Sequence, residues 1–283
     1  MYYLLITASV VMFSFQFLFN QIYERENGGS LRSMLFFTLG ANLTGVIILF
    51  FINGCRIEFT PFTFLLALAA SVNNFIYSYC SIKALGKINL SLYSVFAMLG
   101  GMTLPFIAGI AFFDEALTAG KLICFIAIAV SLFLTVRKDS TGKGLIYYVG
   151  VFIMNGMSGV LSKIFSASQY EKTGNAGYSL LIAAITVLIS AAALIFVKRP
   201  ALKFNVRTAG ASAGYGILSN VANFLLLIAL AHVPASAQYP FITGGVMIIS
   251  TVICFFTPDK PSKREIAAVI LSFAGITALV LLP

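Results

Sequence analysis

The chain has 283 residues, of which 60% are hydrophobic and 10% are charged. A soluble core cannot bury so large an apolar fraction, so the composition excludes an ordinary soluble protein and indicates a membrane protein. The net charge of +9 would suit a nucleic-acid partner, but no basic stretch accompanies a soluble domain that could carry it, so we expect no nucleic acid.

Long apolar stretches follow one another along the chain. A helix needs about 20 apolar residues to cross roughly 30 Å of hydrocarbon, whereas barrel strands alternate over about ten residues. The stretches are also too numerous to be signal peptides. We therefore predict an all-α membrane protein with ten transmembrane helices, near residues 3–22, 31–52, 62–83, 89–111, 119–136, 144–165, 176–197, 209–230, 236–256 and 265–282.

Polar side chains inside these helices are candidates for a substrate pathway, because exposing them to lipid is costly. The first helix has Gln16 and Asn20 four residues apart, and the third has Asn73 and Tyr77 at the same spacing, with Asn74 adjacent. Residues four apart share a helix face. These side chains either line a central cavity or tie helices together, at about 0.6 kcal/mol per interhelical hydrogen bond.

The fourth predicted helix carries Tyr93 near its start and Gly100, Gly101 and Pro105 farther along. Tyr93 is either an anchor at the membrane interface or a substrate contact. Glycines let helices approach closely, and an interior proline kinks a helix, so Gly100, Gly101 and Pro105 serve either packing or a hinge.

The stretch FFDEALTAGK follows the fourth helix and places two carboxylates side by side, Asp114 and Glu115. We interpret them as the exit of this helix into water and not as a reaction centre. An acid just ahead of a helix start is favoured by the helix dipole. In the second half of the chain, Ser262 and Glu265 have the spacing of a capping box at the start of the tenth helix.

The sixth predicted helix holds Asn155, Gly159 and Lys163 at intervals of four. A lysine at mid-bilayer depth costs roughly 2.5 to 3.5 kcal/mol. Lys163 therefore either extends to the headgroups, which its place near the helix end slightly favours, or faces inward toward a carboxylate or phosphate of the substrate.

The eighth predicted helix carries Asn220 and Asn223, three residues apart. Its place in the second half of the chain matches that of the third helix in the first half, so the amides of both helices can converge on one cavity. The ninth helix has Gln238 and Tyr239 near its start, as interface anchors or substrate contacts. It also contains Gly244 and Gly245, which serve either packing or a hinge.

Two halves of the chain resemble each other. The stretch ALGKINLSLYSVFAMLGGM, from Ala84 to Met102, aligns without a gap with ALAHVPASAQYPFITGGVM, from Ala229 to Met247, and six positions agree. A unit of five helices has an odd number of crossings, so its two copies, residues 1–138 and 139–283, enter the membrane from opposite sides. Inverted repeats of this kind are typical of secondary transporters, with the substrate near the midplane.

The basic residues are distributed unevenly over the two sides of the predicted bundle. Fourteen of the 18 lysines and arginines lie on the side reached after the odd-numbered helices, and four lie on the other side. Because basic residues concentrate in the cytoplasm, we predict a multi-pass protein of the cytoplasmic membrane with both termini outside.

The two five-helix halves, the link into a Pro-Ala-Ser turn (ALAHVPASAQYPF) and a fourth helix that closes in FFDEALTAGK resemble the drug/metabolite transporter superfamily, EamA-type branch. The resemblance covers almost the whole chain. It implies transport of amino acids, aromatic compounds, nucleotide sugars, choline-like cations or lipid-linked sugars, often as export. Family members commonly keep their termini in the cytoplasm, whereas the charge count here predicts the reverse.

We therefore expect a secondary transporter that exports a small polar metabolite, an amino acid or similar compound, by alternating access. No acidic residue lies deep in a predicted helix to pair with a cation, so the substrate is neutral, zwitterionic or anionic. The alternative is a flippase for a lipid-linked sugar or a similar amphiphile. No P-loop, metal-ligand cluster or catalytic triad is present in the sequence, so we expect no enzyme activity, cofactor or metal. The expected partners are the substrate and the lipid bilayer, and both a monomer and a homodimer stay open.

Overall fold

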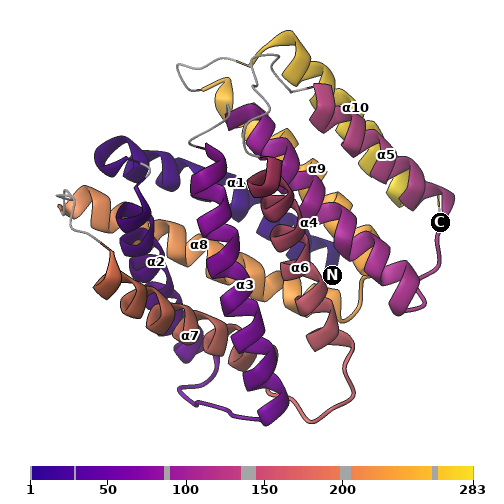
Figure 1. The fold of residues 1–283 in the computed structure, drawn as a ribbon. Helices are drawn as coiled ribbons and strands as arrows, with labels where there is room; N and C mark the ends of the chain where they lie inside the picture. The colour runs from indigo at the N-terminus through magenta and orange to yellow at the C-terminus, as the bar shows by residue number, and fades with distance from the viewer. Residues whose placement is uncertain are drawn as a thin grey trace.

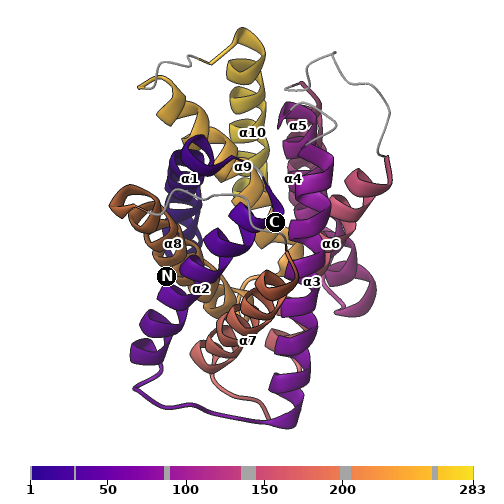
Figure 2. The ribbon, with the colours of Figure 1, turned by 60° about the vertical axis from the view of Figure 1, so that its left-hand side comes forward.

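The structure is a computed structural model that describes residues 2–28, 30–85, 90–134, 145–197, 205–256 and 261–282. Within these ranges every regular element is a helix (Figures 1 and 2). The helices are α1 (Tyr2–Asn27), α2 (Leu31–Ile52), α3 (Pro61–Leu85), α4 (Leu90–Phe112), α5 (Ala119–Leu134), α6 (Leu145–Ala167), α7 (Asn175–Phe196), α8 (Val206–Leu230), α9 (Ala235–Cys254) and α10 (Lys263–Leu281).

Eight of the described helices are long and apolar enough to cross a membrane. The other apolar stretches, Phe96–Phe112 in α4 and Ala119–Leu134 in α5, are shorter. The predicted all-α fold is therefore confirmed, and the long apolar helices indicate a multi-pass membrane protein.

Polar side chains cap several helix starts. Ser262 and Glu265 form the predicted capping box on α10: the Ser262 N–H donates to the Glu265 carboxylate at 2.6 Å, and the Glu265 N–H donates to the Ser262 hydroxyl at 3.3 Å. Asn205 and Thr208 form a second capping box on α8. Such caps satisfy backbone N–H groups that have no partner within the helix.

The helices pack mainly in four pairs, α1 on α8, α4 on α6, α5 on α10 and α2 on α7. Figure 1 shows α5 and α10 side by side along one edge of the molecule. Glycines permit the closest approaches. A Cβ atom on Gly100 would collide with the Phe152 backbone of α6, and one on Gly216 would collide with the Ala41 backbone of α2.

The other small residues singled out in the sequence also lie between helices. Gly101 and Pro105 pack on α6, Gly244 packs on α5 and α10, and Gly245 packs on α1. Their contacts support the packing interpretation, and α4 continues as a helix through Pro105. A hinge at these positions stays a prediction.

One face of the bundle carries both ends of the described chain, and we call it the terminus face. Its loops are residues 53–60, 113–118, 168–174 and 231–234. Contacts join them: the Gly174 N–H donates to Glu58 at 2.9 Å, and the Tyr2 ring stacks on His232 at 4.0 Å between ring centroids. The opposite face carries the starts of α2, α8 and α10.

Candidate substrate site in the interior

A polar stripe runs along the packed side of α8. Tyr215, Ser219 and Asn223 follow one another at intervals of four, so they point in nearly the same direction. Buried residues flank this stripe toward both α1 and α2. All three stripe residues nevertheless keep accessible surface. From side chains that face inward and stay accessible, we infer an internal space beside them.

The inner side of α3 has the same character. Asn74, Tyr77 and Ser78 are partly accessible and lie on the side of the helix opposite the exposed Val72. The phenol of Tyr77 lies close enough to that of Tyr215 to interact electrostatically. In Figure 2, α8 and α3 lie on opposite sides of the centre of the molecule. The interaction of Tyr77 with Tyr215 brings these two polar faces together.

Two further helices, α6 and α9, contribute to the border of this space. The Tyr239 hydroxyl of α9 donates to the Gly159 carbonyl of α6 at 3.1 Å and is hydrogen-bonded to Ser162. Tyr239 and Tyr215 both lie deep within the protein, yet both remain partly accessible. We use the term internal space for the region that these side chains border.

The side chains that border the internal space are neutral. They supply hydroxyls, amides and phenols: Asn74, Tyr77, Ser78, Ser162, Tyr215, Ser219, Asn223 and Tyr239. Such a lining combines aromatic surface with hydrogen-bonding groups that fix orientation, as small-molecule sites do. It suits a substrate without net charge.

Three of the predicted polar residues tie neighbouring helices together. The side-chain amides of Asn73, Asn155 and Gln238 donate to the carbonyls of Met154 at 2.8 Å, Ala97 at 2.6 Å and Leu226 at 3.0 Å, respectively. These bonds join α3 to α6, α6 to α4 and α9 to α8. The side chains therefore hold helices in place, and a role for them in binding stays a prediction.

The predicted asparagines of α1 and α8 bond within their own helices, and the Asn223 amide donates to the Ser219 carbonyl at 2.8 Å. The Asn220 amide donates to the Gly216 carbonyl of its own helix at 2.8 Å, and Asn20 donates to Glu24 at 3.4 Å. Gln16 is buried, and its Oε1 has no hydrogen-bond partner among the described residues. The predicted role of Tyr93 falls on a side chain outside the described part of the structure.

Lys163 is largely buried within the protein and pairs with Glu115. Its Nζ lies 2.7 Å from Oε1 of Glu115, and the two side chains are 12% and 6% exposed. The expectation that Asp114 and Glu115 mark an exit into water is correct for the exposed Asp114 and wrong for Glu115. The reason is the start of α9, whose free N–H groups attract the carboxylate of Glu115 into the protein.

The Glu115 carboxylate is held in its ionised form. Burial by itself raises the pKa of Glu115, but hydrogen bonds from Lys163, from the Ser236 hydroxyl and from two backbone N–H groups outweigh burial. The net effect is a pKa below the ordinary value of 4.5. Lys163 therefore faces a permanent counter-charge, which leaves it unsuited to an anionic substrate in this conformation.

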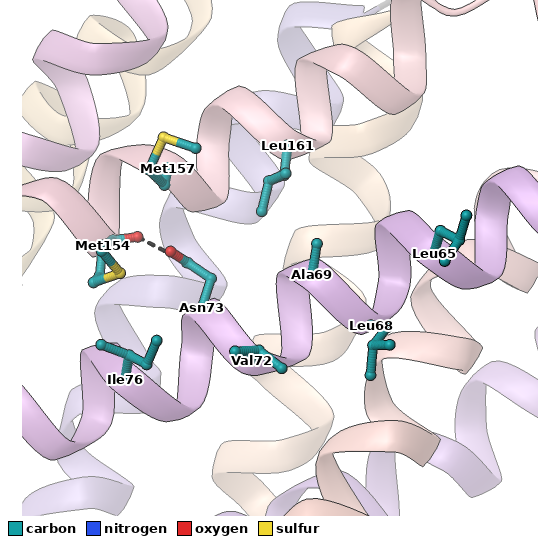
Figure 3. Close-up of a pocket in the computed structure, with 9 residues that line it drawn as sticks. All are labelled: Leu65, Leu68, Ala69, Val72, Asn73, Ile76, Met154, Met157 and Leu161. Carbon is teal, nitrogen blue, oxygen red and sulfur yellow. Dashed lines mark hydrogen bonds between the residues drawn. The ribbon is translucent and has the colours of Figure 1, made fainter.

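A hollow of about 460 Å³ lies between α3 and α6 (Figure 3). Its lining is almost entirely apolar, and the exposed side chains of Leu65 and Val72 place it on the outer surface of the bundle. Asn73 is its polar member, and Figure 3 shows the Asn73 amide bonded to the Met154 carbonyl across the two helices. A groove of this kind can accept an acyl chain from the bilayer.

Sequence reasoning missed Tyr215, Ser219, Ser162 and Ser78, the last of which follows Asn74 by four residues. A signal for the first two is present, since they continue the spacing of four upstream from Asn223. No comparable signal marks Ser162, whose place at the internal space depends on the rotation of α6. Within the described ranges, no group of His, Cys, Asp and Glu residues could hold a metal ion.

Comparisons with known proteins identify the fold but no function. No family model and no curated protein matches this sequence. Several solved structures match, and one of them, described only as "Crystal structure of protein", does so with a TM-score of 0.79 and 14% identity. The match covers 98% of this chain and 96% of the other chain. The same helical fold therefore occurs over the full length of another protein.

Proposed function

We propose that this protein is a secondary transporter that moves a small polar metabolite across the cytoplasmic membrane by alternating access. The observation that carries the proposal is the pair of inward-facing polar stripes on α3 and α8, which remain accessible inside an otherwise packed bundle. A substrate held there lies between the two halves of the chain, as in transporters built from repeats.

The packing of the helices supports an inverted repeat in which α1–α5 correspond to α6–α10. Under this exchange the pair α1–α8 becomes α6–α3, α2–α8 becomes α7–α3, and α4–α6 becomes α9–α1. In each case both the original pair and the pair that replaces it are in contact. The pairs α2–α7, α4–α9 and α5–α10 are also in contact, and the exchange leaves each of them unchanged. If α4 and α5 also span the bilayer, the chain crosses it ten times. The resemblance to the drug/metabolite transporter superfamily then extends over all ten helices.

The charge of the lining restricts the substrate. The bordering side chains are neutral, and the nearby Lys163 is paired with Glu115. A buried charge without a partner is costly, so an anion or a cation would be poorly accommodated. We propose a neutral or zwitterionic substrate, such as an amino acid or a similar metabolite, moved in the export direction.

Thermal unfolding of the purified protein against a metabolite panel tests this function. We expect a neutral or zwitterionic metabolite to raise the Tm, because a ligand that binds only the folded state stabilises it. The same compound should exchange across the membrane of proteoliposomes that contain the protein. A panel in which no water-soluble metabolite raises the Tm or exchanges would contradict the proposal.

A flippase for a lipid-linked sugar is the second candidate, and the apolar groove between α3 and α6 favours it. An acyl chain in this groove would lie against its apolar lining, beside Asn73. The same panel decides between the two functions, because a lipid-linked sugar would then raise the Tm and amino acids would not.

A further inference from the structure

The terminus face is closed by one carboxylate that joins three elements. Glu115, in the loop between α4 and α5, accepts hydrogen bonds from the Ala235 N–H at 2.7 Å and the Ser236 N–H at 2.8 Å. It also accepts from the Ser236 hydroxyl at 2.6 Å and pairs with Lys163 of α6 at 2.7 Å. A residue of the first half of the chain thus binds two helices of the second half.

The start of α9 depends on this carboxylate. Its N-cap residue, Pro234, provides no side-chain cap. Free N–H groups at a helix start need an acceptor, and the helix dipole favours a negative charge there. Glu115 fulfils both needs from another part of the chain, and the contact of its carboxylate with Gly109 leaves no room for a larger residue at that position of α4.

The groups around Glu115 compensate its charge within the protein. Lys163 also lies 5.5 Å from the Phe113 ring centroid, and Lys121 of α5, which donates to the Ala116 carbonyl at 2.6 Å, interacts electrostatically with Glu115. Tyr239 of α9 is a further electrostatic neighbour of the carboxylate. The neighbouring Asp114 is exposed and takes no part.

This cluster lies at the end of the internal space. On α6, Lys163 directly follows Ser162, and on α9, Ser236 precedes Tyr239 by three residues, about one turn. Ser162 and Tyr239 are hydrogen-bonded to each other at the border of the internal space. Separation of α9 from α6 or from the α4–α5 loop at this end therefore requires the Glu115 contacts to break.

We propose that Glu115 is the latch that keeps the internal space closed at the terminus face, and that it releases α9 and Lys163 when this face opens. The inference rests on the proposed transport function. A polar latch suits reversible opening. A buried ion pair is close to balanced between attraction and lost hydration, and water that enters the opening cleft hydrates both charges and the freed N–H groups.

The distance between α4 and α8 at the terminus face tests the latch directly. Spin labels at Phe112→Cys and Ala231→Cys, both at exposed positions, report this distance in a background without other cysteines. We expect Glu115→Ala to add a population with a longer distance. The matched control is Asp114→Asn, which retains a residue type that tolerates the left-handed backbone at φ 53° and should leave one population.

A single unchanged distance in a folded Glu115→Ala protein would overturn the latch. If this variant does not fold, Ser236→Ala decides in its place, because it removes one donor and keeps both backbone contacts. A longer-distance population in Ser236→Ala supports the proposal, and its absence overturns it. The distance is measured without substrate, so its outcome does not depend on the metabolite panel. A panel without a ligand would refute the transport function and would not change the result for the latch.

Discussion

At the scale of single residues, the carboxylate of Glu115 is bound by four donor groups of the protein in place of water. Its adjacent partner in the sequence, Asp114, remains in solvent. The difference comes from their surroundings, since one side chain reaches the open start of α9 and the other does not. Two neighbouring carboxylates therefore have unequal consequences for stability.

Acid should destabilise the protein through Glu115. Its pKa is lower in the folded state than the ordinary 4.5, so its contribution to the free energy of unfolding is complete above pH 4.5 and is lost as the pH falls through the folded pKa. We expect the Tm of the wild-type protein to fall more steeply below pH 4.5 than that of Glu115→Gln, which cannot titrate there. Equal slopes for the two proteins would show that Glu115 is not the titrating group.

Two asparagines of α8 should differ in their effect on substrate binding. Each amide donates to the carbonyl four residues earlier in its own helix, but Asn223 lies on the accessible stripe, whereas Asn220 packs against Gly45 of α2. For a ligand found by thermal shift, we expect Asn223→Ala to raise the Kd about threefold to tenfold, the effect of one hydrogen bond. Asn220→Ala is the control and should change the Kd less than twofold, by about 0.4 kcal/mol or less. The opposite order in ligand titrations would place the site elsewhere.

At the scale of helices, close backbone approach holds the bundle together. Lipid is as apolar as the helix surface, so packing and interhelical hydrogen bonds supply the association that the hydrophobic effect supplies in water. Gly100 between α4 and α6, and Gly216 between α8 and α2, leave no room for a Cβ atom beside the backbone of the neighbouring helix.

Substitution of Gly100 should therefore weaken the pairing of α4 with α6. We expect Gly100→Ala to lower the free energy of unfolding by about 1 to 3 kcal/mol, the usual cost of overpacking. Gly210→Ala is the control, because nothing lies within 4 Å of the added carbon. Alanine there should be neutral or stabilising by up to about 1 kcal/mol. Unfolding curves that rank the two variants the other way would contradict the packing described.

The helices could be predicted from the sequence because their signals are local. The length of the apolar stretch predicts a helix at residues 144–165, and the structure has one at Leu145–Ala167. The spacing of Ser262 and Glu265 predicts the capping box that is found at the start of α10. The inward faces could not be predicted in this way. The helices are apolar on nearly all sides, so contacts with neighbours decide that Asn74 faces the internal space and that Asn73 faces α6. The partner of Glu115 lies 120 residues away, at Ala235, and has no local signal.

At the scale of the whole molecule, the charge distribution predicts that the terminus face lies outside the cell. Ile57, in the α2–α3 loop, and Val206, at the start of α8, are 74% and 91% exposed and lie on opposite faces. In a background without other cysteines, an impermeant thiol reagent should label Ile57→Cys in intact cells. Val206→Cys should react after permeabilisation. The reverse pattern would invert the proposed orientation.

The accessibility of the inner face of α8 tests the central claim, that a water-accessible polar space lies within the bundle. Ser219 belongs to the stripe, and Ile217, two residues earlier, is 41% exposed on the opposite side of the helix. A charged, water-soluble reagent requires water around the thiol, since the thiolate is the reactive form. In permeabilised membranes we expect Ser219→Cys to be labelled and Ile217→Cys to stay unlabelled. Labelling of Ile217→Cys with an unreactive Ser219→Cys would contradict an internal substrate site.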